Sequence, residues 1–98
     1  MFSRTPEYKM RKPKQLERLI RGFSNHRRIE ILGLLDKSPE LSVVEISNAL
    51  SINYKTGADH IRRLTIAGII IKRNDNNFVR HALTSDGKSI LKFLRTLE

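Results

Sequence analysis

Hydrogen-bond donors are concentrated at residues 54–63, at the start of a segment whose apolar residues recur at helical spacing. Short hydroxyl donors stand there beside long cationic ones. The candidate residues are Tyr54, Lys55, Thr56, Asp59, His60, Arg62 and Arg63. Donors near the start of a helix can reach base edges in the major groove of a duplex, while flanking cations meet phosphates. We therefore expect this segment to recognise a nucleic acid, with Lys55, Thr56 and Arg63 as the first choices.

A second basic set follows at residues 72–81, on two short β-branched and aromatic runs separated by a polar turn over residues 74–77. This pattern predicts a hairpin. Its candidate contacts to the phosphate backbone are Lys72, Arg73, Arg80 and His81.

The charge distribution supports a polyanionic partner. The chain has 19 Lys and Arg against 10 Asp and Glu, a net charge of +9. Residues 1–28 carry +7, residues 29–52 carry −3, residues 53–81 carry +4 and residues 82–98 carry +1. The positive charge is thus confined to the amino-terminal region and to residues 53–81, as a binding face requires.

Helical spacing and capping residues define the elements that position these side chains. Residues 1–14 contain five Lys or Arg and two prolines, which predicts a flexible basic arm, and residues 15–98 form one domain. We expect a first helix up to Phe23, a second from about Asn25 to before Ser38, and a third opened by the Ser42–Glu45 capping box. A fourth helix covers residues 54–67, Gly68 caps it, and Thr84–Asp86 opens a last helix.

These elements predict a mainly α protein with a small β-hairpin, in the order α-α-α-α-β-β-α. Two helices joined by a short turn, the second basic on its exposed face and followed directly by a basic hairpin, are the parts of a winged helix-turn-helix.

One motif carries a resemblance to a known family. The stretch from His60 to Ile70, HIRRLTIAGII, is similar to the HLxxLxxAGLV signature of ArsR-type winged-helix regulators, and the YKT start at residue 54 resembles small archaeal members. LTSDGK from Leu83 is similar to the LTxxG step that follows the wing in many winged-helix proteins. The resemblance covers roughly residues 24–88. It implies a dimeric DNA-binding transcriptional regulator, usually a repressor, whose terminal helices form the dimer contact.

The candidate dimer residues are the apolar positions of the two terminal helices: Leu16, Leu19, Ile20, Phe23, Ile90, Phe93, Leu94 and Leu97. They exceed what one small core needs, which favours a homodimer, although they could also close the core of the monomer.

Two departures from the family pattern matter. Metal sensors of the family use a cysteine pair on the third helix, whereas this chain has Val43-Val44-Glu45 there and no cysteine at all, so metal sensing of that kind is not expected. Gly57 stands where the family has an apolar residue. It costs helix stability of about 1 kcal/mol relative to alanine, and it either permits a close helix approach or marks a marginal helix.

Plainer interpretations stand beside these. Asp59 could form ordinary surface pairs with neighbouring cations on the same helix, and His60 could be a packed histidine rather than a DNA contact. The basic arm could be an unstructured solubilising tail, or it could contact the minor groove or the backbone of DNA.

Several function classes are not expected. The carboxylates are scattered, the three histidines lack ligand partners, and there is no phosphate-binding glycine loop, so we expect neither an enzyme, nor a metal site, nor a cofactor. The longest apolar run, Ala67 to Ile71, is too short for a membrane span, and the amino terminus does not resemble a secretory signal, so we expect a cytoplasmic protein.

The sequence therefore predicts a homodimeric, sequence-specific regulator of double-stranded DNA, with the 54–67 helix in the major groove and the 72–81 wing on the backbone. The alternatives are a non-specific architectural DNA-binding protein and a winged-helix module that docks onto other proteins. A small-molecule effector at the dimer contact stays open.

Overall fold

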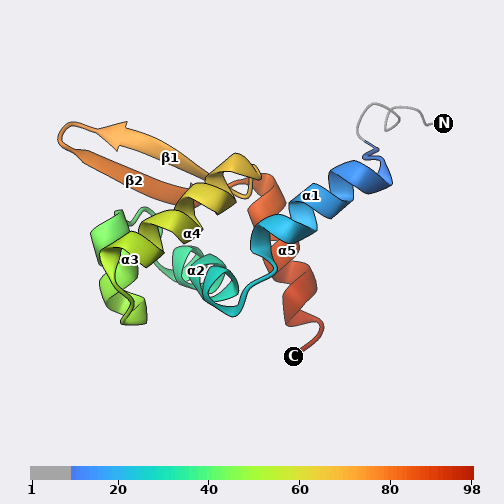
Figure 1. Cartoon of the computed structure of the whole chain (residues 1–98), viewed down its shortest axis with the longest axis horizontal. Coiled ribbons are helices and arrows are strands. Elements are labelled where there is room, and N and C mark those ends of the chain that lie inside the picture. Colours follow the sequence, from blue (N-terminus) through green and yellow to red (C-terminus); the bar gives the residue numbers. More distant parts are fainter. Residues whose placement is uncertain (1–9) are drawn as a thin grey trace.

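The computed structural model describes residues 10–98 as five helices and one two-stranded antiparallel sheet (Figure 1). The order confirms the prediction. The elements are α1 (Pro13–Phe23), α2 (His26–Lys37), α3 (Val43–Leu50), α4 (Tyr54–Ile66), β1 (Ile70–Asp75), β2 (Phe78–Leu83) and α5 (Ser85–Arg95).

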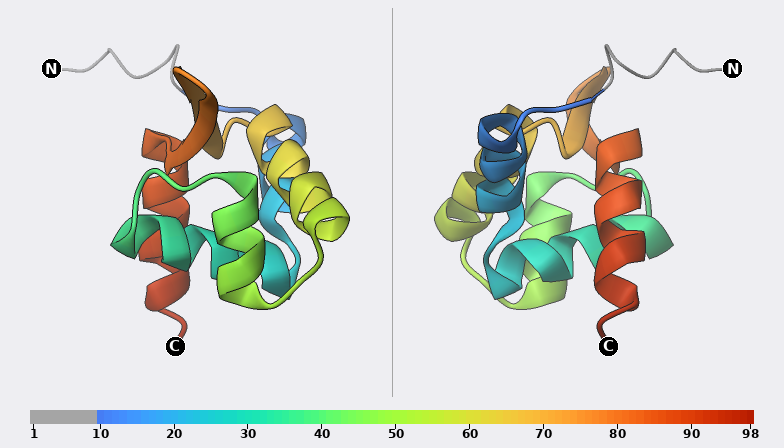
Figure 2. Two further views of the ribbon diagram at one scale, coloured as in Figure 1. Left: turned by 90° about the vertical axis from the view of Figure 1, so that its left-hand side faces the viewer. Right: turned by 90° about the vertical axis from the view of Figure 1, so that its right-hand side faces the viewer.

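Helix α2 lies at the centre of the core. Its residues Ile31, Leu32 and Leu35 are almost fully buried, as its broad apolar surface predicts, and α2 contacts α3, α4, α5 and β2. Two views show α1 and α4 on one side of the molecule and α5 on the opposite side (Figure 2). The exposed face of α4 therefore belongs to the side that α1 also occupies.

Local capping explains where the helices begin. The predicted capping box forms at α3: the Ser42 hydroxyl accepts from the Glu45 amide at 3.2 Å, and the Glu45 carboxylate accepts from the Ser42 amide at 2.8 Å. Asn25 and Asn53 cap α2 and α4 through their side-chain oxygens. Each cap pairs amides that have no partner within the helix.

Thr84 connects the hairpin to α5. Its hydroxyl accepts from the Gly87 amide at 3.1 Å and faces two backbone acceptors, the carbonyl oxygens of Gly68 at 2.7 Å and Ile69 at 2.9 Å. A Cβ at Gly87 would lie 2.3 Å from the Ile69 carbonyl oxygen, so glycine permits the approach. The LTxxG step thus fastens α5 to the residue before β1.

The hairpin is tighter than predicted. Asn74 and Asp75 continue β1 and pair with Val79 and Phe78, which leaves only Asn76 and Asn77 as the turn. Asn76 takes a φ of 57°, which asparagine tolerates better than most residues. The strands are therefore longer than periodicity alone indicated.

The first helix begins inside the predicted arm. Pro13 occupies its first turn, where the missing amide hydrogen costs nothing, so residues 13 and 14 are helical. Residues 1–9 of the predicted arm lie outside the described residues.

Candidate nucleic-acid interface

The start of α4 presents polar side chains to solvent. Tyr54, Lys55 and Thr56 are all exposed, and the exposed fraction of Tyr54 is 59%. The backbone of the same turn is held in place, because the Asn53 side chain accepts from the Thr56 amide at 2.8 Å and Gly57 is buried. The donors therefore project from a positioned backbone.

Gly57 sets the distance between α3 and α4. A Cβ at this position would lie 2.0 Å from the Ser47 Oγ and 3.2 Å from the Ser47 Cβ. Ser47 itself is buried on α3. The close helix approach considered for Gly57 is therefore present, and it holds the two helices of the helix-turn-helix together.

Asp59 organises the arginines of the same helix. Its carboxylate pairs with Arg62 at 3.0 Å and with Arg63 at 2.9 Å. These hydrogen bonds, that of Arg63 first, hold the pKa of Asp59 below its usual value. Asp59 thus forms the surface pairs considered above, and Arg62 and Arg63 remain exposed on the flank of α4.

His60 is half-buried rather than fully offered to solvent. Its Nδ1 is buried and has no hydrogen-bond partner among residues 10–98. Burial is the main cause that lowers its pKa, and the nearby Arg28 guanidinium lowers it further. Burial therefore favours the neutral form of the ring and limits its access to a partner.

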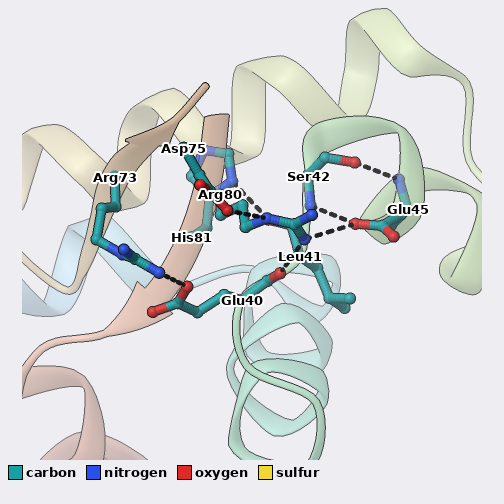
Figure 3. Close-up of polar contacts among 8 residues, drawn as sticks. All are labelled: Glu40, Leu41, Ser42, Glu45, Arg73, Asp75, Arg80 and His81. Atoms are coloured by element: carbon teal, nitrogen blue, oxygen red, sulfur yellow. Dashed lines mark hydrogen bonds and ion pairs between the residues drawn. The ribbon is translucent and has the colours of Figure 1, made fainter. Parts of the chain in front are cut away.

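The two arginines of the wing pair with acids of their own fold (Figure 3). Arg73 pairs with the Glu40 carboxylate, which raises the pKa of Arg73. Arg80 is half-buried. It donates to the Glu40 carbonyl at 3.0 Å, and its guanidinium lies 3.4 Å from the Asp75 carboxylate and 4.0 Å from that of Glu45. Much of the wing's positive charge is thus compensated internally.

His81 does not lie on the surface that would meet phosphates. It is 2% exposed, and both its amide and its Nδ1 lie 2.9 Å from the Leu41 carbonyl oxygen. Because a carbonyl only accepts, Nδ1 carries the hydrogen. The predicted phosphate contact of His81 is therefore replaced by a structural role: it joins β2 to the loop before α3. Lys72 stays exposed, with no ion pair to residues 10–98.

The terminal helices divide their apolar residues between core and surface. Leu16, Ile20, Phe93 and Leu97 are exposed, whereas Leu19, Phe23 and Leu94 are partly buried against the core. Ile90 is 8% exposed and belongs to the core of the monomer, so it is removed from the predicted dimer surface. The four exposed residues remain available for a dimer contact.

The pairing of the wing arginines with acids was not predicted from the sequence. Glu40 lies 33 residues before Arg73, and no spacing rule connects them. Arg18 and Arg21 of α1 were also missed, although together with Arg11 they follow helical spacing, which was a usable signal.

Two further searches concern metals and membranes. No cluster of three or more His, Asp or Glu within residues 10–98 could hold a metal ion. None of the helices in that range is long and apolar enough to cross a bilayer.

Solved structures resemble this fold closely. HlyU from Vibrio cholerae is 28% identical with a TM-score of 0.77, over 90% of this chain and 97% of that chain. The transcriptional regulator HlyU from Vibrio vulnificus is 27% identical with a TM-score of 0.71, over 86% of this chain and 88% of that chain.

A third structure is a homodimeric winged helix-turn-helix DNA-binding domain from Mycobacterium bovis, a possible ArsR-family transcriptional regulator. It is 22% identical with a TM-score of 0.78, over 86% of this chain and 78% of that chain. No protein-family model and no curated protein sequence matches the chain. The similar structures are of regulators, not enzymes. The chain has the winged helix-turn-helix fold, which it shares with the HlyU structures and with this possible ArsR-family regulator.

Proposed function

We propose that this protein is a sequence-specific double-stranded DNA-binding transcriptional regulator that acts as a homodimer, with repression as its mode of action. The observation that carries the proposal is the start of α4, where exposed Tyr54, Lys55 and Thr56 stand on a turn fixed by Asn53 and Gly57. Rigid elements that present a few donors are what base readout requires.

The length of α4 divides the work among its side chains. Arg63 follows Tyr54 by nine residues, about 13 Å along a helix, and the major groove is about 12 Å wide. If the start of α4 enters the groove, Lys55 and Thr56 reach base edges, whereas Arg62 and Arg63 meet a bordering phosphate strand. This moves Arg63 from base readout to backbone contact.

The wing contributes mainly through Lys72. Since Arg73 and Arg80 are paired with Glu40, Asp75 and Glu45, the exposed ammonium of Lys72 is the wing cation best placed to gain a phosphate. Two protomers related by a two-fold axis would place their α4 helices in successive major grooves, about 34 Å apart.

The test is selection from a random duplex library at near-physiological salt, followed by binding titrations on the enriched duplex. Lys55→Ala and Thr56→Ala should weaken the selected duplex more than a random one, because each side chain reads bases. Lys37→Ala, which removes a cation at the end of α2, is the matched control. A two-fold-symmetric motif is expected.

Salt-sensitive binding without an enriched motif would instead identify an architectural DNA-binding protein. Absence of binding to any duplex would favour a protein-interaction module. Repression is tested separately, by placing the enriched motif upstream of a reporter gene and comparing expression with and without the protein. Increased expression would contradict the proposed mode of action.

A further inference from the structure

A groove of about 540 Å³ lies between α1 and the second half of α4. Its floor is apolar and includes Leu19, Ile66 and Ala67. Its rim is basic, and no acid lines it among residues 10–98. The basic lining residues are Arg11, Arg18, Arg21, Arg62 and Arg63.

The two walls are held together by a contact that only a small residue allows. A Cβ at Gly22 of α1 would lie 2.4 Å from the Cβ of Ala67, at the end of α4. The helices therefore touch at this point, and the arginines on either wall are fixed relative to one another.

The positive charge of the groove is only partly compensated. Arg11 pairs with Asp86, Arg21 pairs with Glu17, and Asp59 serves both Arg62 and Arg63. The five lining cations thus have three acidic partners, none of which lines the groove, and the net charge of the set is +2. Most of these partners are at least one-third exposed, so their pairs are weak and can exchange for a stronger anion.

Arg18 differs from the other four arginines in having no acidic partner among residues 10–98. It forms no ion pair and no side-chain hydrogen bond with any of residues 10–98. It stands on the α1 wall, opposite Arg62 and Arg63. Within residues 10–98 its guanidinium therefore keeps all its donors available to a ligand of the groove that it lines.

We propose that this groove binds the sugar–phosphate backbone of duplex DNA, on the strand that borders the major groove entered by α4. The proposal rests on the proposed function, because it takes the position of the DNA from the start of α4. Arg62 and Arg63 belong both to the flank of α4 and to the groove, so a strand that meets them continues directly toward Arg18. Helix α1 lies on the same side of the molecule as α4 (Figure 2), as this path requires.

A backbone fits the groove better than a compact ligand does. The arginines are distributed along α1, the residues just before it, and α4, instead of converging on one buried point. Guanidinium forks pair with phosphates in two-point geometry. The apolar floor can face deoxyribose, which carries no charge. The region of DNA contact would thus extend from α4 onto α1.

The test compares Arg18→Gln with Lys37→Gln, which removes the same charge at the end of α2, outside the groove. Binding is titrated over a salt series on the selected duplex and on a random duplex. Arg18→Gln should reduce the slope of log affinity against log salt by about 1.8 on both duplexes, because each of the two protomers loses one phosphate contact worth about 0.9. Lys37→Gln should leave the slope unchanged, and sedimentation should show the same oligomer for both variants.

Methylphosphonate substitution then locates the contact. Neutral phosphates are introduced one at a time along the strand that borders the major groove. At the phosphate that Arg18 meets, the substitution should weaken wild-type binding but not binding by the Arg18→Gln variant, because the pair is already broken. If the wild-type protein binds DNA and the Arg18→Gln variant shows the same salt slope, only the groove proposal is overturned. If wild-type protein binds no duplex, both proposals fall. Decanoate serves as the probe for an acidic small ligand. If decanoate perturbs the amide NMR signals of Ile66 and Ala67, and DNA binding is insensitive to Arg18→Gln, the groove proposal is overturned in favour of such a ligand.

Discussion

At the scale of single residues, Gly57 couples helix packing to the recognition surface. Gly57→Ala gains helix propensity of about 1 kcal/mol but forces a methyl group against Ser47, and overpacking costs about 1–3 kcal/mol. We expect net destabilisation in urea unfolding. Because the buried Ser47 Oγ has no hydrogen-bond partner among residues 10–98, adding Ser47→Ala should restore most of the loss. A double variant no more stable than Gly57→Ala would contradict this account.

His60 gives a pH dependence of known sign. Its pKa in the folded protein is lowered, mainly by burial, so the unfolded chain binds its proton more tightly. The stabilisation associated with neutral His60 is complete above the unfolded pKa of about 6.5 and is lost as the pH falls through the lower folded value. The urea midpoint should therefore fall from pH 7.5 to 5.5 more steeply in wild-type protein than in His60→Gln. Parallel pH profiles would show that His60 is not responsible.

At the scale of elements, the cations of the wing have two different roles: Arg80 stabilises the fold, and Lys72 binds DNA. Arg80→Ala removes a charged donor from the Glu40 carbonyl and should destabilise the fold by about 1 kcal/mol, since the side chain is partly exposed. Lys72→Ala on the neighbouring strand should leave the urea midpoint unchanged but lower the salt slope of DNA binding by about 1.8, one phosphate contact from each protomer. If Lys72→Ala unfolds earlier and Arg80→Ala keeps full stability, the assignment of the two cations is reversed.

The elements also show where sequence-based prediction works. Caps such as Ser42–Glu45 act over three or four residues, so their positions could be predicted from local spacing. Glu40, which contacts both Arg73 and Arg80, lies in a loop more than thirty residues earlier, and the burial of His81 depends on the same loop. Such contacts follow from the tertiary fold, which is why the wing was predicted to be more available to phosphates than it is.

At the scale of the whole molecule, the architecture was predictable because each element carried its own signal of spacing and capping. It was not predictable which apolar residues of the terminal helices are buried in the core and which are exposed. Ile90 and Phe93 are three residues apart on α5, yet one is buried in the core and the other is 58% exposed. A stripe of apolar residues predicts that a helix face is covered, but only the packed structure shows which residues the monomer itself covers.

The exposed remainder of that stripe gives the last prediction. Phe93 on α5 should lie in the homodimer contact, where a buried aromatic side chain is a typical source of binding energy. Phe93→Ser should weaken dimerisation at least tenfold, about 1.4 kcal/mol, as measured by sedimentation equilibrium. Ile71→Ser on β1, also 58% exposed, is the matched control and should leave dimerisation unchanged. Because both half-sites must be occupied together, the Phe93→Ser variant should lose the preference for a two-fold-symmetric duplex over a single half-site. A variant that remains fully dimeric would place the contact elsewhere than on α5.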